Sequence, residues 1–247
     1  MEAAQKIRNA VTEVAVLRRA CEARPSLGAA VTQVKALQAR RFAGTYADLL
    51  AGGPYAIAAR FFLEELYSAK DYAVRDAQFA RIAGAIERFF PDQVVRAAVA
   101  LAELHAMTEA LDQAMALAWL ARADADASEA LRYVTAWREV GRRKDREAQL
   151  TVVMGIGQQM ARLTRTPGLR TMLKMMRAPA HAAGLGSLQR FLETGFETFA
   201  AMARRRGGVE EFLDTILARE SALIAMLFDS ETVTCGTDLA RTLGQAP

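Results

Sequence analysis

Residues 92–121 read DQVVRAAVALAELHAMTEALDQAMALAWLA, a stretch without proline or glycine. Its apolar side chains recur at spacings of three and four residues, which is the period of an α-helix. Most of the chain shows the same spacing, and no sustained alternation of apolar and polar residues predicts a strand. We therefore expect an all-α protein, a single compact multi-helix bundle of about ten helices with 27–50 and 92–121 at its centre.

Proline and glycine residues divide the chain into the expected helical segments. These segments are 2–23, 27–50, 54–68, 72–89, 92–121, 127–140, 144–164, 168–177, 187–206 and 208–228. No internal repeat and no Ser- or Gly-rich linker separates two halves, so we expect one all-α helical domain over residues 1–230. Residues 231–247 are expected to form a loosely ordered C-terminal tail.

The composition is that of a globular protein, with 52% hydrophobic and 24% charged residues among 247. Cys21 and Cys235 lie far apart and lack the spacing of zinc ligands, which favours a reducing compartment. The first 25 residues carry charges throughout and lack the apolar block of a signal peptide. No uncharged run reaches the roughly 20 residues that a transmembrane helix needs. The sequence predicts a cytoplasmic protein without a transmembrane segment.

The motifs of the common enzyme classes are absent from the sequence. It contains no Walker loop, dinucleotide-binding fingerprint, His-Glu-x-x-His or Gly-x-Ser-x-Gly motif. The sequence therefore favours a binding or regulatory module over an enzyme and indicates no particular cofactor.

The segment 92–121 carries a polar group on a side that is otherwise apolar. His105, Thr108, Glu109 and Asp112 are spaced by three, four and seven residues, so they share one side of a helix. Burying ionised groups without partners costs several kcal/mol. The pattern indicates an internal ion-pair network, a ligand site or a metal site.

The segment 61–67 reads FFLEELY and places Glu64 and Glu65 inside an apolar helix. Adjacent helical residues point about 100° apart, so we expect one glutamate to face inward and the other to face solvent. Tyr67, Arg75 and His105 are the expected neighbours of the inward glutamate. The candidate ligand-binding residues are Glu64, Glu65, Tyr67, Arg75, Asp76, His105, Glu109, Asp112, Gln189 and Glu193.

A metal-dependent alternative is a di-iron-like oxidoreductase that uses Glu65, His105 and Glu109. Ferritin-like proteins use two Glu-x-x-His motifs. This chain has two histidines, and neither follows a glutamate at that spacing. The sequence therefore departs from that pattern, and no metal ligand set is predicted.

The segment 184–199 carries an apolar face made of Leu188, Phe191, Leu192, Phe196 and Phe199. Such a stripe is typical of a core. The alternative is the lining of a pocket for a small hydrophobic or anionic ligand, with Gln189 and Glu193 as its polar anchors.

Residues 138–177 contain ten Arg or Lys and three acidic residues. This stretch predicts a solvated basic face, and the alternative is a binder of nucleic acid or of an anionic surface. Nucleic acid is the weaker alternative because stacking aromatics are absent between Gln149 and Arg190. Within this stretch, residues 170–177 mix basic and apolar side chains. The segment fits either of two alternatives: contact with a membrane or a partner, or burial of its methionines in the core. The sequence leaves a homodimer open.

Two groups of residues resemble a bacterial protein family that is named for its FFLEELY motif. The first comprises 61–67, Asp71, Arg75-Asp76, Phe79, Leu104-His105, Thr108-Glu109 and Leu111-Asp112. The second comprises 176–179, 183–185, Leu188-Gln189, 191–193 and Gly195-Phe196. The likeness covers most of residues 40–200. It implies an uncharacterised bacterial helical protein and no particular activity.

Overall fold

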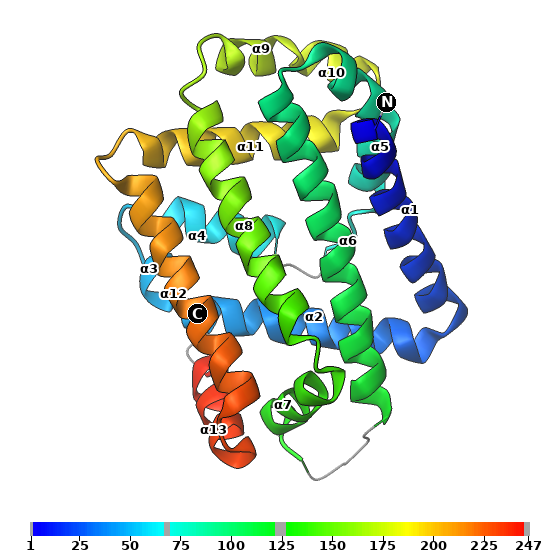
Figure 1. The fold of residues 1–247 in the computed structure, drawn as a ribbon, viewed down its shortest axis with the longest axis vertical. Helices are drawn as coiled ribbons and strands as arrows, with labels where there is room; N and C mark the ends of the chain where they lie inside the picture. The colour runs from blue at the N-terminus through cyan, green and yellow to red at the C-terminus, as the bar shows by residue number, and fades with distance from the viewer. Residues whose placement is uncertain (1, 67–69, 122–126, 245–247) are drawn as a thin grey trace. The chain divides into compact units, whose positions relative to one another are not determined.

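The computed structural model describes residues 2–66, 70–121 and 127–244 (Figure 1). All regular secondary structure in these ranges is helical, which confirms the predicted all-α fold. The described residues form thirteen helices rather than about ten. They are α1 (Glu2–Ala23), α2 (Pro25–Thr45), α3 (Ala47–Leu50), α4 (Ala56–Glu65), α5 (Ala73–Phe89), α6 (Asp92–Ala121), α7 (Glu129–Val140), α8 (Arg143–Leu163), α9 (Leu169–Met175), α10 (Arg177–Ala182), α11 (Gly186–Ala203), α12 (Gly208–Asp229) and α13 (Thr232–Leu243).

Backbone proximity divides the chain into two units. The first unit comprises Met1–Ala15, Lys70–Ala106 and Val152–Leu213. The second comprises Val16–Ala69, Met107–Thr151 and Asp214–Pro247. Helices α1, α6, α8 and α12 each contribute residues to both units. A single domain over residues 1–230 stays a prediction.

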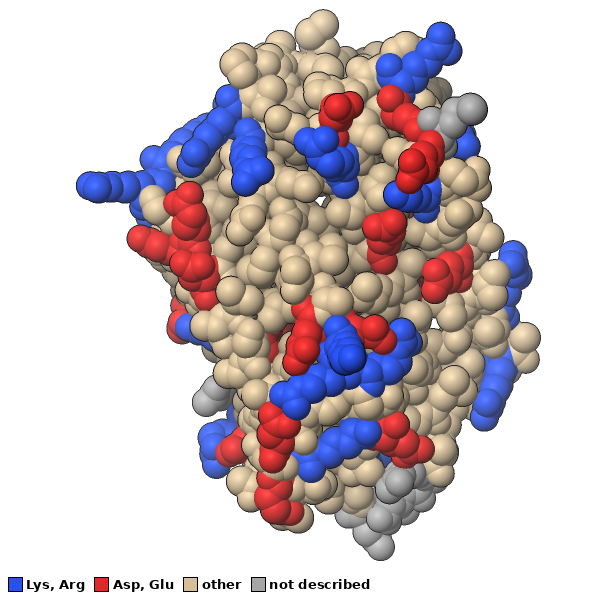
Figure 2. All heavy atoms as spheres, viewed as in Figure 1, with Lys and Arg blue, Asp and Glu red and all other residues tan. Residues whose placement is uncertain are grey.

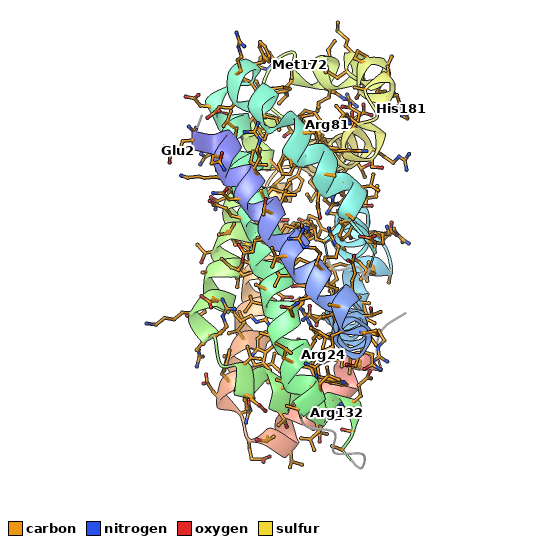
Figure 3. The ribbon with its side chains drawn as sticks, turned by 90° about the vertical axis from the view of Figure 1, so that its right-hand side faces the viewer. Glu2, Arg24, Arg81, Arg132, Met172 and His181 are labelled. Atoms are coloured by element: carbon orange, nitrogen blue, oxygen red, sulfur yellow. The ribbon has the colours of Figure 1, made fainter. Side chains whose placement is uncertain are left out.

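The core of the first unit is built from α1, α5, α6 and α11. Ile7 is fully buried on α1, and it belongs to one apolar cluster with Phe79 of α5 and Leu188 of α11. Arg81 of α5 donates a hydrogen bond of 2.5 Å from Nη2 to the carbonyl oxygen of Ala183, just after α10 (Figure 3). This bond ties α5 to the segment that leads into α11.

The core of the second unit is built from α2, α6, α7, α12 and α13. Val34, Trp119, Trp137 and Leu227 are buried in one cluster. Helix α13 packs against α7 and α2. The buried polar residues Arg41, Asp112 and Glu220, described below, belong to the same unit.

The predicted helix 27–50 ends early, because its chain turns at Tyr46 between α2 and α3. Tyr46 is fully buried, and its hydroxyl donates a hydrogen bond of 3.0 Å to Glu220 of α12. Just before the turn, a Cβ at Gly44 would lie 1.8 Å from the carbonyl oxygen of Thr242 on α13. Both partners are distant in sequence, so local periodicity could not indicate the break.

The expectation of a loosely ordered tail after residue 230 is wrong for the described residues, because 232–243 form α13. The side chain of Glu231 accepts hydrogen bonds from the backbone N–H groups of Val233 and Thr234 and so caps the helix. Cys235 and Leu239, one helical turn apart, are fully buried. The cap and the buried apolar pair hold this segment on α7 and α2.

Candidate functional site

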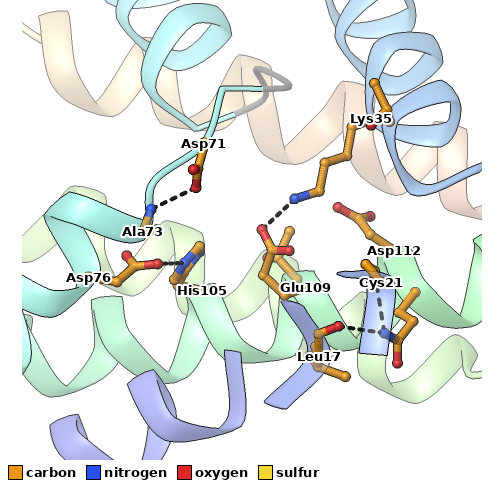
Figure 4. Close-up of polar contacts among 12 residues, drawn as sticks. Leu17, Cys21, Lys35, Asp71, Ala73, Asp76, His105, Glu109 and Asp112 are labelled. Carbon is orange, nitrogen blue, oxygen red and sulfur yellow. Dashed lines mark hydrogen bonds and ion pairs between the residues drawn. The ribbon is translucent and has the colours of Figure 1, made fainter. Parts of the chain in front are cut away.

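An ion pair joins α2 to α6 in the second unit. The Nζ of Lys35 lies 2.6 Å from Oε1 of Glu109, and each side chain is 16% exposed. Figure 4 shows the Lys35 ammonium directed at Glu109. A charge-assisted contact with this little exposure is screened by water less than a surface pair. Lys35 therefore forms a partly buried ion pair with Glu109.

Asp112 lies one turn further along α6 and is 2% exposed. Its Oδ1 accepts a hydrogen bond of 3.0 Å from Nε2 of Gln38 on α2. Among the described residues, no cation forms an ion pair with Asp112. A buried carboxylate is thus held by a neutral amide, although burying an unpaired charge is costly.

Burial raises the pKa of the Asp112 carboxyl from its ordinary 3.8 to about 6. The positive charges of Lys35 and Arg146 oppose this rise, and the negative charge of Glu109 adds to it. The hydrogen bond from Gln38 lowers the pKa by a smaller amount. Asp112 therefore changes its charge close to neutral pH.

Helices α7 and α8 complete the polar environment. Burial raises the pKa of Tyr133 on α7, and the charge of Asp112 raises it further. Arg146 of α8 is buried, with its guanidinium carbon 4.1 Å from the centre of the Trp137 ring. We call Lys35, Gln38, Glu109, Asp112, Tyr133 and Arg146 the Asp112 network.

A second buried carboxylate faces α2 from α12. Oε1 of Glu220 lies 2.5 Å from Nη1 of Arg41 and also accepts the hydrogen bond from the Tyr46 hydroxyl. Glu220 and Arg41 are both buried. Here the carboxylate has a cation and a hydroxyl as partners, which is the arrangement that a buried ion pair needs.

In the first unit, the predicted residues Arg75, Asp76 and His105 come together. Nε2 of His105 lies 3.0 Å from Oδ2 of the buried Asp76 (Figure 4). The guanidinium carbon of Arg75 lies 3.9 Å from the ring centre of Tyr72 and 4.4 Å from that of Phe191. The result is a charged group between two aromatic faces, beside a carboxylate–imidazole pair.

The described part of the FFLEELY segment places its two phenylalanine rings inside and one acid outside. Phe61 and Phe62 of α4 are buried, whereas Glu64 is exposed and Glu65 is half-buried. Both acids belong to the last turn of α4, since the helix ends at Glu65. Tyr67 lies outside the described residues. The expectation that one of the two glutamates faces solvent is met by Glu64.

Gln189 and Glu193, the predicted anchors of a hydrophobic pocket, bond to the chain itself. Nε2 of Gln189 donates to the carbonyl oxygen of Leu173, at 2.7 Å, and to Glu193, at 2.8 Å. Glu193 pairs with Arg177, which lowers the pKa of this carboxyl. Leu188, Phe196 and Phe199 are buried. These contacts hold α9 and α10 on α11, and a ligand pocket here stays a prediction.

The metal-dependent alternative gains no support from the described parts of the chain. In those parts, no group of three or more His, Cys, Asp or Glu side chains is placed to hold a metal ion. Glu65 and Glu109 belong to the second unit and His105 to the first.

Many cations of the basic stretch bond to groups of the chain itself. Arg138 donates to the carbonyl oxygens of Leu227 and Ser230, and Arg143 pairs with Asp229. Arg146 is buried in the Asp112 network. The first half of the stretch therefore connects helices, while nucleic-acid or anionic-surface binding through 138–177 stays a prediction.

Sequence reasoning missed the partners that α2, α7 and α8 supply, although α2 carried a signal. Lys35, Gln38 and Arg41 recur every three residues beside the apolar Val34 and Leu37. This spacing brings polar side chains toward a helical face that is otherwise buried. The partners on α7 and α8 had no such local signal.

Fold and site together define an all-helical protein whose second unit buries one carboxyl without an ion pair. The chain belongs to the family described as Domain of unknown function (DUF8198), whose model matches residues 17–234. Searches of curated proteins and of solved structures found no match. Among the described residues, no helix combines the length and apolar character needed to cross a bilayer. Membership of this family assigns no activity, and the resemblance to the FFLEELY-motif family stays a prediction.

Proposed function

We propose that this protein is a regulatory module rather than an enzyme, and that it responds to protonation of Asp112. The proposal rests on the observation that this buried carboxyl has a neutral amide as its partner. Asp112 is buried against the amide of Gln38, while the nearby ammonium of Lys35 is bound to Glu109. A carboxyl kept in such a position lowers the stability of the folded protein near neutral pH, and groups of this kind are concentrated at functional sites.

The charged groups around Asp112 support a change that begins with one proton. Lys35 on α2 and Arg146 on α8 favour its ionised form, whereas Glu109 on α6 opposes it. Tyr133 on α7 stays neutral because burial raises its pKa. Desolvation outweighs these charges, so the proton is bound at mildly acidic pH and released above it.

The consequence of proton uptake is tighter packing of α2 on α6. In the neutral form, Asp112 carries no charge that would favour hydration, and its carbonyl oxygen still accepts from Gln38. In the ionised form, the uncompensated charge favours separation of the two helices and entry of water. Proton uptake thus biases a helix pair between two packings, which is how a local charge change acts as a switch.

Amide hydrogen exchange of residues 27–45 and 107–121 tests this proposal. After correction for intrinsic exchange, protection should rise by up to about tenfold between pH ~7.5 and pH ~5. The Asp112→Asn variant should lose this dependence. Asp238→Asn, which changes a half-exposed carboxylate on α13, is the matched control and should keep this dependence. An equal pH response in all three proteins would exclude Asp112 as the sensor.

A second candidate function is binding of a small anionic ligand at the Arg75 site of the first unit. The observation in its favour is the guanidinium between Tyr72 and Phe191, next to the Asp76–His105 pair. An anion with an aromatic part would meet both the cation and the rings. Titration with benzoate, followed by the NMR signals of the His105 ring, tests it. Shifts that persist in Arg75→Gln would contradict it.

A further inference from the structure

The first unit exposes an apolar and cationic surface at one end of α8, along α9 and at the turn between α11 and α12. Met175 is 72% exposed and Met176 is 40% exposed, so the alternative of buried methionines does not hold for these two residues. The surface also carries exposed basic side chains: Arg162, Arg165, Lys174, Arg204, Arg205 and Arg206.

Three observations place these basic residues at the same end of the unit. A Cβ at Gly157 on α8 would lie 2.6 Å from Cδ2 of Leu213 on α12, so the two helices are in contact there. Beyond that contact, α8 continues to its C-terminal end at Leu163, and α12 extends back to its N-terminal end at Gly208. Figure 1 shows these two helix ends on the same side of the contact. Figure 2 shows basic side chains gathered over this region.

Glu197 of α11 links this group to α9. Arg170, which hydrogen-bonds to Glu197, lowers the pKa of its carboxyl, and the charges of Lys174 and Arg204 lower it further. Lys174 and Arg204 therefore lie near enough to Glu197 for their charges to act on it. Because Arg170 is paired with it, at 2.6 Å, Lys174 and Arg204 remain available to another anion.

The availability of these cations distinguishes them from other arginines of the chain. Within the described residues, the side chains of Arg162, Arg165, Lys174 and 204–206 form no ion pair. By contrast, Arg40, Arg142 and Arg241 are exposed arginines that pair with Glu129, Asp145 and Asp238. Like charges that lie close together and have no ion-pair partner repel one another, so an external anion is the partner that this surface fits.

Helix α9 is held firmly enough to present its methionines outward. The bond of Gln189 to Leu173 and the ion pair of Arg170 fix it on α11, and the ion pair of Arg177 fixes the adjoining α10. Met172 and Leu173 of the same helix are half-buried. Exposed, unbranched apolar side chains flanked by cations suit the interface of a lipid bilayer, where the side chains enter the acyl region and the cations meet phosphate.

We propose that this surface, made of Arg162, Arg165, α9, Met176 and 204–206, docks on membranes that contain anionic phospholipids. The exposed methionines favour a bilayer over nucleic acid, since residues 162–190 contain no Phe, Trp or Tyr for base stacking. The proposal is independent of the Asp112 network, which lies in the second unit.

Flotation with vesicles tests the proposal on the full chain. The protein should float at low salt with vesicles of phosphatidylcholine and phosphatidylserine, and not with phosphatidylcholine alone. The triple variant Arg204→Gln, Arg205→Gln, Arg206→Gln should lower the partition coefficient about a hundredfold, since each basic residue contributes about fivefold. The variant Met175→Ser, Met176→Ser should lower it by about tenfold at equal net charge.

The matched control removes the same number of charges elsewhere. Arg40→Gln, Arg142→Gln, Arg241→Gln should leave partitioning within about threefold of the unmodified protein. Circular dichroism checks that each variant is folded. If both triple variants lowered the partition coefficient equally, binding would depend on net charge alone and not on this surface, and the proposal would be overturned. Vesicle binding unaffected by the methionine changes, with displacement by single-stranded oligonucleotide, would overturn it in favour of a polyanion site.

Discussion

Two buried carboxylates face the same helix and differ in what that helix offers them. Asp112 meets Gln38, and Glu220 meets Arg41, which follows three residues later on α2. Both acids are buried in the second unit. Glu220 also accepts from the Tyr46 hydroxyl, whereas among the described residues Asp112 accepts a side-chain hydrogen bond from the Gln38 amide alone.

The difference shows that burial alone does not decide what a carboxyl does. A buried acid with a cation and a hydroxyl is a structural ion pair, and removing its cation leaves an uncompensated charge. A buried acid with an amide is a group that exchanges its proton near neutral pH. The first arrangement fixes α12 on α2, and the second makes the packing of α6 on α2 dependent on pH.

The largest effect should come from breaking the ion pair. Arg41→Gln leaves Glu220 buried with the Tyr46 hydroxyl, and we expect the free energy of unfolding at neutral pH to fall by about 3–5 kcal/mol. Urea unfolding followed by circular dichroism measures it. The neighbouring Arg40→Gln is the control, because its pair with Glu129 is half exposed and should cost under ~1 kcal/mol. An equal fall in the free energy of unfolding for both variants would show that the buried Arg41–Glu220 pair contributes no more than the exposed pair.

Removing the charge of Asp112 should have the next largest effect, with the opposite sign. A folded-state pKa of about 6, above the ordinary 3.8, means that the folded protein binds the proton more tightly than the unfolded chain. Stability therefore falls as pH rises through this window, by about 3 kcal/mol in total. Asp112→Asn keeps an oxygen for Gln38 and removes the charge.

We therefore expect Asp112→Asn to be more stable than the unmodified protein by about 3 kcal/mol above pH ~7 and equally stable below pH ~4. Urea unfolding across this pH range measures the difference. A variant that is less stable at neutral pH would show that the ionised carboxylate is well compensated, like Glu220.

A smaller effect should follow from deleting the amide donor. Gln38→Leu leaves Asp112 without its hydrogen bond, and we expect a loss of about 1.5–3 kcal/mol at neutral pH that shrinks on acidification. The pKa of Asp112 should rise above its present value. Gln38→Arg should have the opposite effect and lower the pKa of Asp112, since a cation at this position gives Asp112 the kind of partner that Glu220 has. An unchanged pKa in both variants would mean that position 38 does not control the carboxyl.

The helices were predictable where one strong periodic pattern ran between breakers. The segments 2–23 and 92–121 match α1 and α6 at both ends. The break at Tyr46 and the close approach of α13 to Gly44 depend on partners about 170–200 residues away, Glu220 and Thr242. Glu231 is a cap at the start of α13 that local reasoning could have recognised.

The site was predictable in its residue types and less so in its partners. Asp76 and His105 were both candidate residues, but His105 was expected beside the FFLEELY glutamates, and its contact with Asp76 was not predicted. Glu109 and Asp112 were expected to need partners, but a helix sequence does not reveal which other helix supplies them. The side chains of Lys35 and Gln38 come from a segment about 70 residues earlier, placed by the packing of apolar residues around them.

Direct titration of the Asp112 carboxyl tests the central claim most directly. The carboxyl carbon signal, assigned by comparison with Asp112→Asn, is followed by NMR from acid to neutral pH. We expect a midpoint at about pH 6, with the signals of α2 and α6 changing at the same pH. A midpoint near the ordinary 3.8 would show that the buried carboxylate is fully compensated, and the proposed switch would be wrong.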